Sequence, residues 1–299
     1  KDQRRLVDVC FRRRDPEFAA RPTDDEFAPF DQNLDASQRQ AVLHALRAEE
    51  IALIHGPPGT GKTTAVVEVV RQAVARDLSV LACAPSNVAV DNLAERLLHA
   101  GLRIVRIGQP VRVLPAVVDH CLPVLVQNAE EQRLLRDLRR ELQDVQRKWL
   151  RAPRHQRHDL REMQRRLRQE QRTLEHAIVQ GFIDTADVVL ATTTGAADMA
   201  LGDRMFDLVV VDEAAQAFEA ATWLPLLRAR RGVLAGDHCQ LPPTVVSDAA
   251  ARGGLGTTLF ERLHQQPLGE QLARMLTVQY RMNRAIAAWS SATFYGDAL

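Results

Sequence analysis

The sequence is poor in several residue types, and each shortage excludes a class of protein. Aromatic residues make up only 5% of the 299 residues. No apolar run approaches the roughly 20 residues that a membrane-spanning helix needs, and no charged-then-apolar leader opens the chain. We therefore expect no membrane partner and no targeting signal. Hydrophobic residues still reach 46%, which allows a sizeable core and argues against disorder.

Cysteine is also scarce. The four cysteines, Cys10, Cys83, Cys121 and Cys239, lie far apart, and no two of them have the close spacing of a metal-binding pair. Scattered single cysteines are typical of a reducing compartment rather than of a disulfide framework or a zinc site. We expect reduced thiols and a cytoplasmic location.

The charges nearly cancel, because 39 lysines and arginines oppose 38 acids and leave a formal net charge of +1. The chain is therefore no polycation, and only a local basic patch would attract nucleic acid. Lysine occurs only at positions 1, 62 and 148, and arginine supplies the remaining basic residues. Lys62 thus stands out before any motif is considered.

Residues 1–33 show no regular pattern. A basic stretch comes first, and an acidic, proline-containing stretch follows it. The basic stretch holds Arg4, Arg5, Arg12, Arg13 and Arg14. We interpret the segment as the end of a preceding stalk helix followed by a linker. A basic arm that binds nucleic acid is the alternative.

From residue 34 onward, short apolar runs alternate with helical stretches. A helix is expected after Asp35, which is a good capping residue. The apolar runs are residues 51–54, 78–84, 104–107, 188–191, 208–211, 233–235 and 275–278. Continuous Val, Ile and Leu runs separated by helices predict a mostly parallel sheet that is covered on both faces. The predicted fold class is therefore α/β, with a doubly wound sheet.

One segment interrupts this alternation, because residues 126–180 contain no strand signal. Apolar residues recur there at steps of three and four, in two sets that each line one helix face. The sets are Leu134, Leu138, Leu142, Val145 and Trp149, then Leu160, Met163, Leu167, Leu174 and Ile178. Pro153 lies between them and ends the first helix. We predict a helical hairpin at 126–180, inserted between two parts of one domain at 34–125 and 181–299.

The outer face of the predicted hairpin is rich in arginine. Arg157, Arg161, Arg165 and Arg168 are spaced by four, four and three residues, so one helix would present them together. One interpretation is that they contact the phosphates of a nucleic acid. The alternative is a solvated face whose arginines pair with acids of the same helix.

A glycine-rich segment gives the strongest chemical signal. It follows the apolar run 51–54 and precedes the helical stretch 65–75, as a phosphate-binding loop requires. Its glycines let backbone N–H groups close around phosphate oxygens. Lys62 is predicted to reach the β- and γ-phosphates of ATP, and Thr63 to offer its hydroxyl to Mg²⁺. The loop consists of Gly56, Pro57, Pro58, Gly59, Thr60, Gly61, Lys62, Thr63 and Thr64.

Two more polar segments follow apolar runs. Asp212 and Glu213 come directly after the run 208–211. The first carboxylate can hold Mg²⁺ and the second can polarise the attacking water, although such a pair alone is often only a helix cap. Gln240 follows the run 233–235, at a strand end that faces the ligand crevice of an open α/β sheet. We predict that it senses the γ-phosphate and orients water.

Six segments occur in an order that resembles a superfamily 1 helicase, in the branch that contains the nonsense-mediated-decay helicase. The similarity is greatest to the immunoglobulin-mu-binding helicase type. The segments are residues 56–64, 84–92, 191–195, 212–216, 236–243 and 279–282. The resemblance runs from about residue 34 to residue 299. It implies a RecA-like domain whose family hydrolyses ATP and moves 5′ to 3′ on single-stranded DNA or RNA.

The resemblance also implies roles that the residues alone do not assign. Gln38 would read the adenine, Tyr280 would lie beside it, and Arg281 would contact the γ-phosphate. Segments that touch the nucleic-acid strand would be Pro85, Ser86 and Asn87, together with Thr192, Thr193, Thr194 and Gly195. The hairpin would match a helical subdomain of the first motor domain. The second motor domain and the preceding small barrel of the family would be missing from this chain, so the piece alone would be poorly active.

We therefore predict the first motor domain of a helicase or translocase, with ATP and Mg²⁺ as cofactors and single-stranded nucleic acid as partner. Its catalytic set would be Lys62, Asp212, Glu213, Gln240 and Arg281. One alternative is another phosphotransferase with the same loop, which would have no use for the strand-contacting segments. Another is a truncated, non-catalytic binding module, against which the intact Glu213 argues. The choice between DNA and RNA stays open, because these motifs contact backbone rather than base edges.

Overall fold

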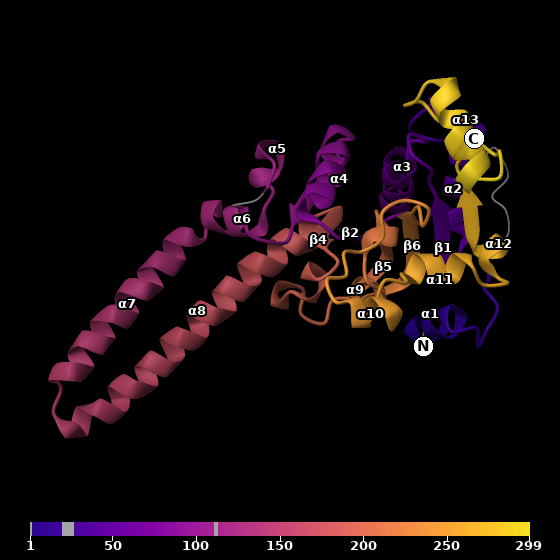
Figure 1. Cartoon of the computed structure of the whole chain (residues 1–299). Coiled ribbons are helices and arrows are strands. Elements are labelled where there is room, and N and C mark those ends of the chain that lie inside the picture. The colour runs from indigo at the N-terminus through magenta and orange to yellow at the C-terminus, as the bar shows by residue number, and fades with distance from the viewer. Residues whose placement is uncertain (1, 20–26, 111–112) are drawn as a thin grey trace.

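The computed structural model describes residues 2–19, 27–110 and 113–299. Figure 1 shows a twisted sheet with helices on both sides and a long two-helix arm that leaves the sheet at one end. Within the described residues, no helix combines the length and the apolar character needed to cross a membrane.

The described strands form one seven-stranded sheet in the order β3-β4-β2-β5-β6-β1-β7, and every pair in it is parallel. The strands are β1 (Ile51–His55), β2 (Val80–Ala84), β3 (Ile104–Arg106), β4 (Val188–Thr192), β5 (Phe206–Val211), β6 (Ala229–Gly236) and β7 (Ala273–Met275). The predicted parallel α/β sheet is confirmed.

The last predicted strand was placed too late along the chain. We expected it at 275–278, whereas β7 pairs with β1 from residue 273 to residue 275. Leu276 still donates its N–H to the carbonyl of His55 at 2.8 Å. The chain then turns toward the phosphate loop, where the N–H of Tyr280 donates to Gly59 at 2.9 Å. Pairing with β1 therefore ends where the nucleotide site begins.

Helices cover both faces of the sheet, because alternate strand residues point to opposite sides. Ile54 packs in a core with Val69 of α3, and its neighbour Leu53 packs in a second core with Phe260 of α11. The first face carries α2 (Ala36–Arg47), α3 (Lys62–Val74) and α4 (Asn87–His99). The second carries α1 (Asp2–Cys10), α9 (Glu219–Leu226) and α11 (Leu259–His264). The doubly wound arrangement is confirmed.

Apart from the two long helices of the hairpin, five further α-helices have 4 to 11 residues in the described part of the chain. They are α5 (Pro115–Val118), α6 (Leu122–Asn128), α10 (Asp248–Arg252), α12 (Gly269–Leu272) and α13 (Arg284–Phe294). The N-terminal α1 buries Leu6 and Val9 in the second core. Part of the predicted linker, residues 20–26, lies outside the described residues.

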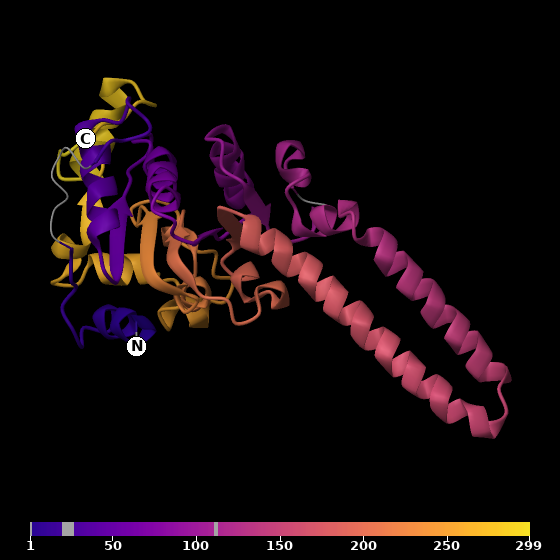
Figure 2. The same ribbon diagram turned by 180° about the vertical axis from the view of Figure 1, so that it is seen from behind.

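A helical hairpin of residues 132–185 lies between β3 and β4, where the sequence predicted one at 126–180. It is built from α7 (Gln132–Arg151) and α8 (Arg157–Thr185), and Figures 1 and 2 show it projecting away from the sheet. Two of its predicted contact residues are wrong: Leu134 is 57% and Met163 is 43% exposed. Leu135 is buried and Gln164 half-buried in their place. The contact faces thus repeat every seven residues, as two helices that pack along their length require.

Candidate nucleotide-binding site

The topology gathers the predicted chemical residues at one edge of the sheet. Strands β5, β6 and β1 are neighbours, and all three are parallel. Their carboxyl ends are followed by Asp212, by the segment that contains Gln240, and by the phosphate loop. Residues more than 180 positions apart in the sequence therefore meet at a single crevice.

The phosphate loop requires glycine at two positions. Gly59 and Gly61 have φ values of 79° and 74°, a left-handed conformation that other residues rarely adopt. A Cβ atom on Gly59 would also come within 2.5 Å of the Cβ of Arg281. Because α3 begins at Lys62, the loop points the free N–H groups of that helix toward the crevice.

Lys62 and the two carboxylates after β5 form one charged cluster. The Nζ of Lys62 lies 2.7 Å from Oε1 of Glu213 and 3.9 Å from Oδ1 of Asp212. The hydroxyl of Thr63 donates to Oδ2 of Asp212 at 3.2 Å. Burial raises the pKa of Asp212, and the charge of Lys62 opposes that rise. The oxygens of Thr63 and Asp212 form a hard donor set that suits Mg²⁺.

A cavity of about 330 Å³ lies over this cluster. Its wall includes Arg96 of α4, which the sequence analysis did not identify. Nothing in the sequence marks this arginine, because it reaches the cavity only through the packing of α4 beside α3. The cavity is lined by Gly56, Pro57, Pro58, Gly59, Thr60, Gly61, Lys62, Thr63, Thr64, Arg96, Glu213, Gln240, Tyr280 and Arg281.

Gln38 lies beside the loop, behind Gly61. Its side-chain amide donates to the carbonyl of Thr60 at 2.9 Å, and its oxygen accepts the N–H of Asp35 at 3.1 Å. Asp35 also accepts a hydrogen bond from the hydroxyl of Tyr280 at 3.0 Å. The structure thus brings Gln38 and Tyr280 together through Asp35, a link that the sequence analysis did not anticipate.

Gln240 is held by a buried carboxylate that the sequence analysis also missed. Its amide donates to Asp237 at 2.6 Å. Asp237 further accepts from the hydroxyl of Tyr295 at 2.7 Å and lies 3.0 Å from Nε2 of His55. Burial alone would raise the pKa of Asp237, but hydrogen bonds from His55, Gln240 and Tyr295 outweigh it and lower the pKa to about 2. Asp237 is therefore a charged anchor for the Gln240 segment.

The two segments predicted to contact nucleic acid lie side by side. Strands β2 and β4 are paired with Ala84 opposite Thr192, so the residues after both strands meet at the same edge. The side chain of Asn87 accepts a hydrogen bond from buried Arg106 at 2.7 Å. Thr193 is only 3% exposed, whereas Ser86 and Thr194 face solvent. The side chains of Ser86 and Thr194 are thus accessible to a nucleic acid, whereas the side chain of Thr193 is not.

The chain matches two protein-family models. A family model described as "AAA domain" matches residues 33–248, and a second model with the same description matches residues 255–299. The first match alone covers more than half of the chain.

Three curated relatives illustrate the similarity. DNA-binding protein SMUBP-2 of Mus musculus is 47% identical over 271 residues, covering 89% of this chain and 27% of the mouse protein. DNA polymerase alpha-associated DNA helicase A of Schizosaccharomyces pombe is 37% identical, covering 90% of this chain and 40% of its own length. The regulator of nonsense transcripts 1 homolog of Arabidopsis thaliana is 38% identical, covering 89% of this chain and 20% of the plant protein. The chain thus spans less than half of each relative.

Proposed function

Because the chain belongs to the superfamily 1 helicases, in the branch of the nonsense-mediated-decay helicase, we propose that it is the ATP-binding motor domain of a protein that moves 5′ to 3′ on single-stranded DNA or RNA. The observation that carries the proposal is the cluster of Lys62, Thr63, Asp212 and Glu213 at the mouth of the phosphate loop. A cytoplasmic location stays a prediction.

The cluster suggests how the residues would share the work. In the structure Lys62 neutralises Glu213 at 2.7 Å. The γ-phosphate of ATP would compete for the Lys62 ammonium, which would free Glu213 to accept a proton from the attacking water. Thr63 and Asp212 would hold Mg²⁺, which neutralises charge on the phosphates when it is bound.

Gln240 and Arg281 would connect the γ-phosphate to movement. Both line the cavity, on different segments. Gln240 is anchored to buried Asp237, so a shift of Gln240 toward phosphate would pull on the segment after β6. Gln38 and Tyr280, joined through Asp35, would form the adenine side of the site.

The segments after β2 and β4 would contact the nucleic-acid backbone. Arg106 and Asp91, both 2% exposed at the side chain and 3.1 Å apart, form a buried ion pair that holds Asn87 in place. A phosphotransferase acting on a small molecule would have no use for this second polar edge. The geometry therefore favours a nucleic-acid motor over that alternative.

The proposal is tested on the longer protein of which this domain would be a part, by measuring its ATP hydrolysis with and without single-stranded DNA or RNA homopolymer. We expect nucleic acid to stimulate hydrolysis, and Glu213→Gln to slow the stimulated rate by at least about 100-fold, as loss of a general base does. ATP binding should persist. The matched control is Glu270→Gln, because Glu270 is exposed on α12, away from the cavity. A hydrolysis rate that nucleic acid does not change would instead favour the phosphotransferase.

A further inference from the structure

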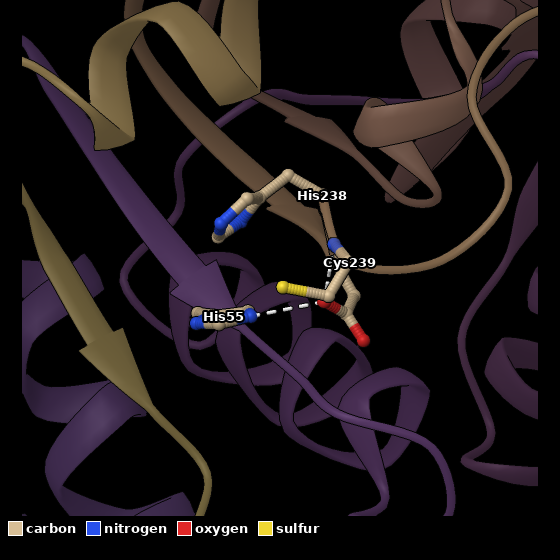
Figure 3. A group of neighbouring side chains, drawn as sticks. His55, His238 and Cys239 are labelled. Atoms are coloured by element: carbon tan, nitrogen blue, oxygen red, sulfur yellow. Dashed lines mark hydrogen bonds and ion pairs between the residues drawn. The ribbon is translucent and has the colours of Figure 1, made fainter. Parts of the chain in front are cut away.

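Next to the nucleotide site, side chains able to bind a metal ion gather at the carboxyl ends of β1 and β6. One donor atom from each of His55, Asp237, His238 and Cys239 lies within 4.8 Å of the other three. Figure 3 shows the ring of His238 and the sulfur of Cys239 gathered beside the ring of His55. Sequence analysis did not predict this cluster, because no cysteine pair marks it and His55 lies more than 180 residues before the other three members.

We propose that His55, Asp237, His238 and Cys239 form a binding site for a divalent metal ion of borderline softness, with Zn²⁺ as the preferred ion. Two imidazoles, a thiolate and a carboxylate are all ligands that Zn²⁺ accepts in tetrahedral sites. Mg²⁺ and Ca²⁺ prefer oxygen ligands alone. The site therefore differs in chemistry from the pair Thr63 and Asp212.

The spacing of the donors is close to what such an ion requires. The ligand atoms of a tetrahedral zinc ion lie about 3.3–3.8 Å apart, given its bond lengths of about 2.0–2.3 Å. Nε2 of His55 and Oδ1 of Asp237 are 3.0 Å apart. The most distant donors, within 4.8 Å, need to approach by about 1 Å. His55 would bind the ion through Nε2 as the neutral tautomer, with its proton on Nδ1, and Cys239 would bind as thiolate after losing its proton to solvent.

The surroundings fit a bound ion. His55 is 4% and Asp237 2% exposed. Nδ1 of His238 is buried and has no hydrogen-bond partner among the residues that the structure describes. A buried nitrogen without a partner is unfavourable, and a metal ion bound there would satisfy it. Asp237 is already fixed by the hydroxyl of Tyr295 at 2.7 Å and by the N–H of Cys239 at 3.0 Å, so the carboxylate is oriented before the ion arrives.

The metal site adjoins two segments that line the nucleotide cavity. His55 directly precedes Gly56, the first residue of the phosphate loop, and Cys239 directly precedes Gln240. A bound ion would tie the ends of β1 and β6 together and fix the base of both segments. We expect Zn²⁺ to raise the melting temperature of the protein, because a ligand that binds only the native state stabilises it.

The experiment is a titration of the metal-free protein with Co²⁺, a spectroscopic substitute for Zn²⁺, followed by displacement with Zn²⁺. We expect one Co²⁺ per chain, with the visible absorption of tetrahedral Co²⁺ and a thiolate-to-cobalt charge-transfer band. Zn²⁺ should abolish both signals. The thiolate band separates this site from any Co²⁺ bound at Thr63 and Asp212, which offer only oxygen.

Variants locate the ion. Cys239→Ala should remove the charge-transfer band and weaken Co²⁺ binding at least tenfold, and His238→Ala should weaken it similarly. His176→Ala, on an exposed position of α8, is the matched control and should bind as the unaltered protein does. Circular dichroism without metal checks that each variant folds. Absence of the thiolate band, or unchanged binding by folded Cys239→Ala, would overturn the proposal.

Discussion

Lys62 lies in the phosphate loop and is one of only three lysines in the chain. Its ammonium group forms an ion pair with Glu213 at the cavity. We expect Lys62→Ala to weaken binding of a fluorescent ATP analogue at least tenfold, about 1.4 kcal/mol, without unfolding the domain. Lys148→Ala, at an exposed position of α7, is the control. If the folded Lys62 variant and the control bind the ATP analogue with equal affinity, Lys62 does not contribute to nucleotide binding.

His44 is a single residue whose burial should make stability depend on pH. Its Nε2 lies 2.9 Å from the carbonyl of Leu272, and burial lowers its pKa to about 4. In the unfolded chain this histidine has an ordinary pKa of about 6.5. Between about pH 4 and pH 6.5 it is therefore protonated in the unfolded state and neutral in the native state. The free energy of unfolding should therefore fall as the pH drops from about 6.5 to about 4, by up to about 3 kcal/mol from His44.

Urea denaturation at several pH values measures this dependence. His44→Gln retains a hydrogen-bond donor but does not titrate, so its stability should vary less across the window. His176→Gln, at an exposed position, should leave the curve unchanged. Identical curves for His44→Gln and the unaltered protein would mean that other groups cause the dependence.

At the scale of the elements, the hairpin divides the arginines of its outer face into two kinds. The guanidinium groups of Arg157 and Arg161 each lie 5.4 Å from the ring centre of Trp149. Arg157 also donates to the carbonyl of Ala152 at 3.0 Å. Arg165 and Arg168 are exposed, and no ion pair joins either to another residue in the described part of the chain. The face is therefore not uniform, because Arg157 and Arg161 contact Trp149 whereas Arg165 and Arg168 have no such contact in the described part of the chain.

This division sharpens the test of nucleic-acid contact by the hairpin. If Arg165 and Arg168 contact a strand, replacing both with Gln should weaken binding similarly for every sequence and flatten the salt dependence by about 1.4 in log–log slope, at roughly 0.7 per contact. The control replaces Arg140 and Arg147 of α7, each 3.5 Å from an acid of the same helix. Binding of a homopolymer at several salt concentrations measures the slope. An unchanged slope in the first variant would leave the hairpin a structural or partner-binding element.

For the molecule as a whole, the match to the mouse relative includes 89% of this chain and only 27% of the mouse protein. In the family that the sequence resembles, a second motor domain supplies a further arginine to the ATP site. We expect residues 1–299 alone to bind ATP weakly and to hydrolyse it slowly, because such an arginine contributes about 10³–10⁵ in rate in related phosphoryl transfers. Steady-state hydrolysis with and without single-stranded nucleic acid checks this. Rapid, strand-stimulated turnover by these residues alone would mean that the cavity around Lys62 needs no further arginine.

The hairpin and the strands show where sequence prediction works and where it stops. The parallel sheet follows from continuous apolar runs, which any buried strand needs. The last strand was predicted to begin two residues later than it does. Its bounds are set by pairing with β1 and not by the extent of the apolar run. In the hairpin, the steps of three and four were correct, but they did not decide between Leu134 and Leu135. Packing of α7 against α8 decided this, by burying Leu135 and leaving Leu134 exposed.

The phosphate loop, the carboxylates after β5 and the α/β class could be predicted from the sequence, because each depends on residues close together in the chain. Which distant residues share a site follows from the folded structure alone. Arg96 reaches the cavity through helix packing, and Asp35 contacts both Gln38 and Tyr280, which lies 245 positions after Asp35. His55 meets Asp237 because β1 and β6 are neighbours in the sheet. Strand order and helix packing are set by the core as a whole, and no local pattern records them.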